Sequence, residues 1–293
     1  MRAAGLPDGG IQGAVFCCNN SGYNAQLPNY TAHYAAAGVA GAISYHHYAV
    51  GGCGGKAVSM EELLADGASA GGAAYLAPFS AACAQAAIPF VVGEANSVSC
   101  GGRRNISDAF GSALWAWDAM LNLAAIGAAR VNFHGGTHEA YTPVGWPGLP
   151  QSRVPDVRPL YYAALAMAEA SANSSTLMAA AVQGSNALIK AHALRDARGL
   201  WRVVVVHKDP AAAATATVSV TPAAAGSGDA SLARLRAAGG VTGRYAVTWR
   251  GQTFDGSQDG LPLGAPTAEA VPLRDGAYSF SLPPAEAAML TFS

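Results

Sequence analysis

The sequence is poor in charge. Only 12% of its 293 residues are Asp, Glu, Lys or Arg, and the formal net charge at pH 7 is −1. The 17 lysines and arginines nearly balance the 18 aspartates and glutamates, so the chain has no excess of positive charge with which to bind a phosphate backbone. We therefore expect no nucleic-acid partner.

Long apolar runs are also missing. Hydrophobic residues make up 51% of the chain, but alanine accounts for much of that share. The longest candidate, residues 114–129, is interrupted by Asp118 and Asn122, which predicts an amphipathic packing helix and no membrane span. The first ten residues contain no apolar core of a signal peptide. Either the protein is not secreted or its natural start lies upstream, and both explanations stay open.

Cysteine is scarce and unevenly distributed. All five cysteines lie in the first 100 residues, at positions 17, 18, 53, 83 and 100. Their spacing fits neither a metal site nor a dense disulfide framework, and an odd number leaves at least one thiol free if bridges form. Four Asn-x-Ser/Thr triplets, at positions 19, 29, 105 and 173, would permit glycosylation in a secretory pathway, although such triplets also arise by chance.

The first 175 residues alternate between short apolar runs and helical segments. We expect strands at residues 11–17, 41–48, 89–93 and 129–133. We expect helices at residues 27–37, from Ser59 with Glu62 as its capping-box partner, from Ser107 or Asp108 to about 125, and at 160–172. This alternation indicates a parallel sheet with helices outside, and four such units are half of an eight-unit (β/α)8 barrel.

The remaining residues have the pattern of an antiparallel β domain. Short alternating segments separated by Gly, Pro and Asp predict strands at residues 177–183, 189–194, 201–207, 215–220, 244–249, 278–282 and 289–292. About seven such strands are typical of a β-sandwich. The predicted fold class is α/β plus all-β, with a half barrel at residues 1–175 and a sandwich at residues 176–293.

Glu94 is the leading candidate for chemistry. It follows the apolar run at residues 90–93, where a buried parallel strand is expected to end. Catalytic groups in barrels of alternating strands and helices stand at the carboxyl ends of strands. Asn96, Ser99 and Gly101 follow, which predicts a tight, hydrogen-bonded loop after the strand. A solvated loop carboxylate is the competing interpretation.

Side chains on the second predicted strand alternate between its two faces. His46 and Tyr48 therefore face one way, and Tyr45 and His47 face the other. On the pocket side, Tyr48 can hydrogen-bond to Glu94 and keep it ionised, as a nucleophile requires. A zinc site is also suggested by His46, His47, His134, His138 and Glu139, but His46 and His47 point apart and no His-x-His or His-Glu-x-x-His pair occurs. We expect no metal and no other cofactor.

Several motifs together resemble glycoside hydrolase family 79, which contains β-glucuronidases and heparanase-like enzymes. They read Tyr-His-His-Tyr at 45–48, Gly-Glu-Ala-Asn-Ser at 93–97, Ala-Leu-Trp-Ala-Trp-Asp at 113–118 and Val-Asn-Phe-His-Gly-Gly at 131–136. The resemblance implies a C-terminal half barrel followed by a sandwich, and retaining hydrolysis of a β-linked glucuronide. It implies that full-length members are secreted, vacuolar or lysosomal.

The resemblance also assigns roles to residues. It places the catalytic nucleophile at Glu94, with His46 and Tyr48 beside it in the pocket. Substrate-binding positions fall on Asn96, Ser99, Gly101 and Tyr141, of which Gly101 and Tyr141 match groups that contact the uronic-acid carboxylate. Family members often carry Tyr at the position of Ser99.

One family feature is absent. The acid/base glutamate of the family follows an asparagine on the fourth barrel strand, and this sequence contains no Asn-Glu pair. The resemblance therefore implies an N-terminally incomplete, catalytically impaired chain whose open barrel edges pair with an N-terminal half or with a second copy. The alternative is a non-catalytic carbohydrate-binding or interaction protein in which the sandwich is the working module.

Overall fold

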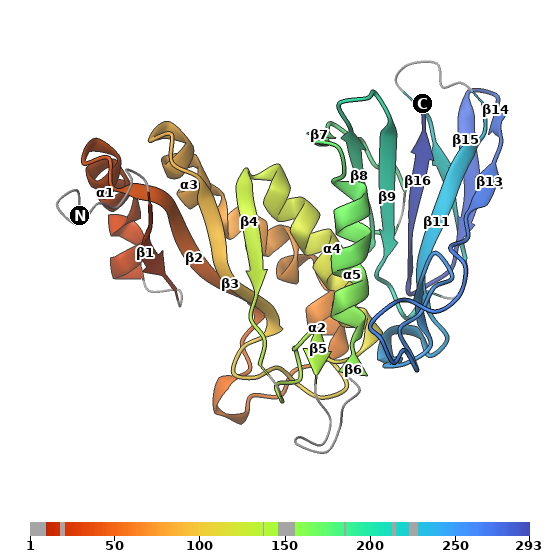
Figure 1. The fold of residues 1–293 in the computed structure, drawn as a ribbon, viewed down its shortest axis with the longest axis horizontal. Coiled ribbons are helices and arrows are strands. Elements are labelled where there is room, and N and C mark those ends of the chain that lie inside the picture. Colours follow the sequence, from red (N-terminus) through yellow and green to blue (C-terminus); the bar gives the residue numbers. More distant parts are fainter. Residues whose placement is uncertain are drawn as a thin grey trace.

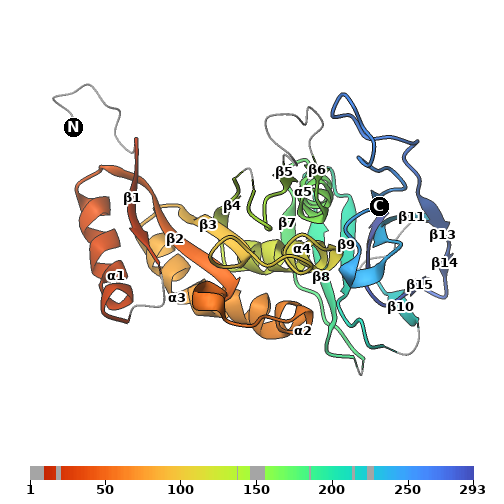
Figure 2. The ribbon, with the colours of Figure 1, turned by 90° about the horizontal axis from the view of Figure 1, so that it is seen from below.

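The fold was analysed in a computed structural model. The structure describes residues 10–17, 21–136, 138–145, 156–184, 186–212, 215–222 and 228–293. Figures 1 and 2 show a parallel sheet near one end of the long axis and a β-rich part at the other end, with helices α4 and α5 between them.

The first part is a sheet of four parallel strands in the order β1-β2-β3-β4. The strands are β1 (Ile11–Phe16), β2 (Ala40–Val50), β3 (Phe90–Val98) and β4 (Ala128–Phe133). The helices are α1 (Ser21–Ala36), α2 (Met60–Leu64), α3 (Ala70–Gln85), α4 (Phe110–Ala125) and α5 (Pro159–Ala170). The predicted alternation of strands and helices is confirmed. Within the described part of the chain, β1 and β4 each have a strand neighbour on one side only.

One face of this sheet is covered by helices. Ile43 and Tyr45 on β2 and Phe90 on β3 are buried in a cluster with Leu27 of α1 and Leu76 of α3. Burial of such side chains contributes roughly 1.5–3 kcal/mol each. The alternation of side chains along β2 therefore points the neighbouring residues, including His46, to the opposite face, as the sequence predicted.

Strand β3 is longer than predicted. The prediction ended it at Gly93 and placed Asn96 in a loop, but pairing with β2 continues through Val98, and the placement of Asn96 was wrong. The register shifts where Tyr45 pairs with Val92 and His46 with Glu94, so Gly93 is the extra residue of a bulge. A Cβ at Gly93 would lie 2.9 Å from Ser44 Cβ, which explains why the strand needs glycine there.

The β-rich part contains two antiparallel sheets. The larger has the order β12-β11-β16-β9-β8-β7, with β13 paired to β11, and the smaller has the order β10-β15-β14. The strands of the larger sheet are β7 (Thr176–Met178), β8 (Ile189–Arg195), β9 (Trp201–His207), β11 (Ala230–Ala237), β12 (Val247–Trp249), β13 (Glu269–Val271) and β16 (Glu286–Phe292). The smaller sheet contains β10 (Ala216–Val220), β14 (Leu273–Arg274) and β15 (Ala277–Leu282). The predicted antiparallel sandwich is confirmed.

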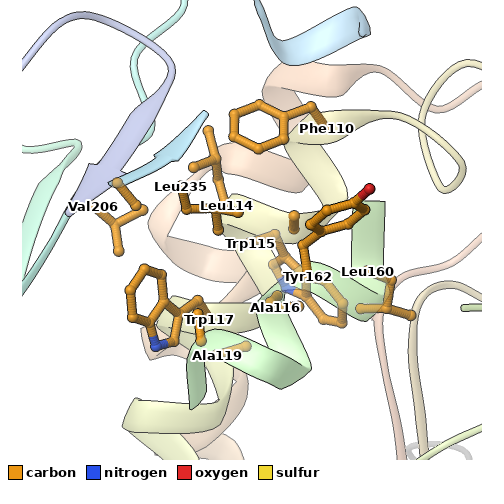
Figure 3. Close-up of a cluster of buried hydrophobic side chains, with 14 of the residues drawn as sticks. Phe110, Leu114, Trp115, Ala116, Trp117, Ala119, Leu160, Tyr162, Val206 and Leu235 are labelled. Atoms are coloured by element: carbon orange, nitrogen blue, oxygen red, sulfur yellow. The ribbon is translucent and has the colours of Figure 1, made fainter. Parts of the chain in front are cut away.

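Both faces of the larger sheet are buried. Val203 and Leu290 pack in a cluster with Phe280 of the smaller sheet. On the opposite face, Val206 and Leu235 belong to the cluster that contains Trp117 of α4, and Figure 3 shows these side chains together. The sheet thus shares one core with the helices of the first part, and the proposed boundary near residue 175 falls between α5 and β7.

A buried polar cluster lies within this shared core. The carboxylate of Asp118 on α4 accepts hydrogen bonds from Lys208 Nζ at 2.6 Å, Ser69 Oγ at 2.6 Å and His192 Nε2 at 2.8 Å. The side chains of Asp118 and Lys208 are 0% exposed. Burial alone would raise the pKa of Asp118, but the bonds from His192 and Lys208 outweigh it and hold the pKa well below its usual range.

Local predictions about helix starts had mixed outcomes. The capping box is confirmed, because Ser59 Oγ accepts the Glu62 N–H and the Glu62 carboxylate accepts the Ser59 N–H. The cap predicted for α4 was wrong, because Ala109 occupies the N-cap position. Asp108 instead accepts the Asn105 N–H, since a buried carboxylate takes the nearest free donor.

Cys53 and Cys100 form a disulfide between two described residues. Cys83 is a free thiol and is buried. No helix in this part of the chain combines the length and the apolar character needed to cross a membrane. The described His, Cys, Asp and Glu side chains form no group of three or more suited to hold a metal ion.

Candidate active site

Glu94 lies on the sheet face opposite the buried helices. Tyr48 Oη donates a hydrogen bond to Glu94 Oε1 at 2.6 Å, and His46 Nδ1 lies 3.5 Å from Oε2. These contacts follow from the strand register, which pairs His46 with Glu94 and places Tyr48 two residues further along the same face. The Glu94 side chain is 30% exposed, so it is held by the protein and still open to a ligand.

The Tyr48 hydroxyl is a stable proton donor to this carboxylate. Partial burial raises the pKa of Tyr48, and the hydrogen bond to Glu94 raises the pKa further, because ionisation would bring two negative charges together. The tyrosine therefore keeps its proton at neutral pH. Its hydrogen bond at 2.6 Å fixes the position of the Glu94 carboxylate, the group that would act as a nucleophile.

His134 joins this group from the end of β4. Its Nδ1 atom lies 3.0 Å from Tyr48 Oη, 2.7 Å from Tyr141 Oη and 3.7 Å from Glu94 Oε1. The sequence prediction considered His134 only as a metal ligand and left it out of the candidate site. Its position after an apolar strand, like that of Glu94, was the signal that would have included it.

Tyr141 is brought to the same group. Its hydroxyl meets His134, and its ring centroid lies 6.1 Å from that of Tyr48. Glu94, His46 and Tyr48 therefore converge, as predicted from strand positions, and Tyr141 joins them, as the family resemblance implied. The three side chains that contact the Glu94 carboxylate, among those the structure describes, are Tyr48, His46 and His134.

Asn96 and Ser99 have supporting positions instead. Asn96 is 1% exposed, and its Nδ2 donates to the carbonyl oxygens of His134 at 2.7 Å and Tyr141 at 3.2 Å. Ser99 Oγ accepts the Gly52 N–H at 2.9 Å, beside the Cys53–Cys100 disulfide. Among the described residues, neither side chain contacts Glu94, because Asn96 binds the backbone of the loop after β4 and Ser99 binds the backbone of the loop after β2.

Gly101 and Gly102 form the turn that receives the Tyr141 loop. The carbonyl of Gly101 accepts the Ala140 N–H at 2.7 Å. Gly102 has φ +79°, and a Cβ there would lie 2.9 Å from both Tyr141 N and Ser107 Oγ. The close approach of two backbones therefore requires glycine at position 102.

Replacing Gly102 with Ala is expected to destabilise the protein by about 1–3 kcal/mol more than replacing Gly54 with Ala. Gly54 also has a positive φ, +68°, but a Cβ there would meet no neighbouring atom within 4 Å, so that variant controls for backbone conformation alone. Urea unfolding of the two variants measures the difference. Equal destabilisation would show that the approach of Tyr141 to Gly102 is not tight.

The other predicted residues are separated from this group. His47 is half-buried on the helix-covered side, where a Cβ on Gly72 would lie 2.4 Å from its Nε2, and desolvation lowers the pKa of His47. The Glu139 carboxylate accepts the His138 N–H at 3.2 Å. His47 and Glu139 are therefore not grouped with His46 and His134, the two histidines beside Glu94.

Comparison with known proteins links the C-terminal part of the chain to a family. Residues 191–289 match the model of the glycosyl hydrolase family 79 C-terminal beta domain. A stretch of 56 residues is 45% identical to a beta-glucuronidase from Neurospora crassa, covering 19% of this chain and 10% of that protein. The C-terminal part of the chain therefore matches glycoside hydrolase family 79. The family resemblance seen in the motifs is thereby confirmed.

Solved structures share the fold of this chain. A 4-O-alpha-L-rhamnosyl-beta-D-glucuronidase from Fusarium oxysporum 12S superposes with a TM-score of 0.78 at 22% identity, over 96% of this chain and 59% of that one. A GH51 arabinofuranosidase from Xanthomonas axonopodis pv. citri gives a TM-score of 0.66 at 13% identity, over 96% and 57% of the two chains. The chain thus spans less than two thirds of the length of the solved structures that it matches.

Proposed function

We propose that this chain is the nucleophile-bearing part of a retaining glycoside hydrolase that acts on β-linked glucuronides. The observation that carries the proposal is the bond from Tyr48 to Glu94, which positions a partly exposed carboxylate on the sheet face opposite the helices. The family match and the names of the matched glucuronidases support the reaction and substrate class.

In the proposed mechanism, a Glu94 oxygen attacks the anomeric carbon and the bond to the leaving oxygen breaks, which forms a covalent glycosyl-enzyme. His46 and Tyr48 orient the carboxylate from either side. Tyr141 and the Gly101 turn are the proposed contacts for the uronic-acid carboxylate. Asn96 and Ser99, first expected to bind substrate, hold the loops that carry these groups.

We propose that the four parallel strands are half of an eight-stranded barrel. Within the described residues, the outer sides of β1 and β4 have no strand beside them, and four more strands would pair there. The same edges are the sites for pairing with a second copy. A retaining mechanism needs a second carboxyl group about 5 Å from the nucleophile. The contacts of Glu94 in this part of the chain are a tyrosine and two histidines, so we propose that the acid/base carboxylate comes from the other half.

The isolated 293-residue chain is therefore expected to show negligible turnover of an aryl β-glucuronide. Loss of general-acid assistance alone costs typically about 10²–10⁴-fold. The measurement is release of the aryl group by the purified chain, with a form of the protein that contains all eight barrel strands as the comparison. Robust turnover by the chain alone would refute the missing-acid argument. Glycan binding without turnover in the eight-stranded form would favour the non-catalytic carbohydrate-binding alternative.

A further inference from the structure

Arg158 is a buried cation beneath the loop that carries Tyr141. It lies between β6 (Asp156–Val157) and α5, and its side chain is only 6% exposed. Its Nη1 donates to the carbonyl oxygens of Glu139 at 2.5 Å and Ala140 at 3.2 Å, and reaches that of Thr142 at 3.5 Å. One guanidinium thus binds the backbone on both sides of Tyr141.

The geometry of this loop depends on such a donor. The Glu139 carbonyl also accepts the Thr142 N–H, but the carbonyls of Ala140 and Thr142 are buried acceptors of Arg158, and such an acceptor costs about 1–3 kcal/mol without a partner. The planar guanidinium binds these carbonyls through Nη1 and Asp156 through Nε at the same time, whereas a lysine ammonium is a single point donor. Because the Tyr141 hydroxyl meets His134 Nδ1 at 2.7 Å, a shift of the loop would move the hydroxyl away from the group around Glu94.

The all-β part of the chain is connected to the same loop. Arg158 Nε binds Asp156 Oδ2 at 3.2 Å, and Arg244 Nη2 lies 3.7 Å from that oxygen. Arg244, which precedes β12, also places its Nε 3.3 Å from Asp108 Oδ2, in the loop after β3. Next to it, the Gly243 carbonyl accepts the Phe110 N–H at 2.8 Å. Arg244 therefore lies between the loops that follow β3 and β4.

We propose that Arg158 is a positioning residue for Tyr141, and that Arg244 makes the all-β domain part of the active site by fixing Asp156 and Asp108. The role assigned to Tyr141 in binding the substrate carboxylate rests on the proposed function. The positional claim does not, because it concerns only the distance between the Tyr141 hydroxyl and His134.

The test is the NMR signal of the His134 ring in the free protein, identified by its disappearance in His134→Gln. Tyr141→Phe removes the hydroxyl and defines the full displacement of that signal. Arg158→Met is expected to displace the His134 signal in the same direction as Tyr141→Phe, by at least half as much. Arg158→Lys is expected to show most of the displacement seen in Arg158→Met. Arg244→Met is expected to displace the signal less than Arg158→Met does.

Arg202→Met is the matched control, because Arg202 is equally buried, with 7% of its side chain exposed, and pairs with Asp196 at 3.2 Å within the sandwich. It is expected to lower stability and leave the His134 signal unchanged. A folded Arg158→Met protein with the wild-type His134 signal would overturn the proposal, as would an equal displacement in Arg202→Met. No substrate is present, so failure of the proposed glucuronidase activity would not affect the result.

Discussion

Replacing Glu94 with Gln is expected to abolish turnover in a form of the protein that contains the acid/base carboxylate. Removing the nucleophile of a covalent mechanism lowers kcat by roughly 10⁵–10⁶-fold. Gln keeps the size of the side chain, and its amide can still meet Tyr48 Oη, so the fold should be retained. The measurement is kcat for an aryl β-glucuronide, together with mass spectrometry for a glycosyl adduct on Glu94.

Glu61→Gln is the control for this experiment. Glu61 lies in the first turn of α2, and its carboxylate is exposed. The same change of charge there should leave kcat within about twofold of the wild type, since surface substitutions remote from a site have small effects. A Glu94→Gln protein with near-normal kcat would remove Glu94 from the nucleophile role.

Replacing Lys208 with Met is expected to lower the free energy of unfolding by about 3–5 kcal/mol. The change leaves the Asp118 carboxylate buried without its cation, and the cost of a buried unpaired charge exceeds the gain from an added apolar side chain. Adding Asp118→Asn to Lys208→Met should recover part of the loss, because the uncompensated charge is then gone. Urea unfolding at neutral pH measures both.

Lys190→Met supplies the comparison with an exposed pair. Lys190 Nζ lies 2.6 Å from Asp66 Oδ2, but the Asp66 side chain is 46% exposed. A pair of this kind contributes about 0–1 kcal/mol. If Lys208→Met and Lys190→Met destabilise the protein equally, burial of the Asp118–Lys208 pair does not determine its effect.

The stability that Asp118 contributes to the folded protein is expected to depend on pH. The pKa of Asp118 is lower in the folded state than in the unfolded state, so its stabilisation is present above the ordinary aspartate pKa of about 3.9 and is lost as pH falls below it. The stability difference between the wild type and Asp118→Asn should therefore be constant near neutral pH and shrink below about pH 4.

Strand periodicity identified much of the site. Glu94 follows an apolar run, and two-residue alternation put His46 and Tyr48 on one face, where the structure finds both in contact with Glu94. Local rules failed where tertiary contacts replaced them. Asn96 is polar and was placed in a loop, but the carbonyls of His134 and Tyr141 satisfy its amide inside β3.

Long-range pairing explains the largest omission in the predicted fold. Strand β11 has the sequence Ala-Ser-Leu-Ala-Arg-Leu-Arg-Ala, which is rich in helix-forming residues, and no strand was predicted there. It is nevertheless a strand because β12, β13 and β16 supply hydrogen-bond partners on both of its edges. These partner strands lie at residues 247–249, 269–271 and 286–292, too far along the chain for a local sequence pattern to reveal the pairing.

The sequence by itself determined the alternation of strands and helices in the first part, the family resemblance, and the face on which Glu94, His46 and Tyr48 stand, because these depend on short periodic patterns and local motifs. Only the tertiary structure decided that His134 and Tyr141 join them, that Arg158 and Arg244 lie beneath the loops, and that Asp118 meets Lys208. Those contacts join residues from separate elements, and the packing of the elements sets the distances between them.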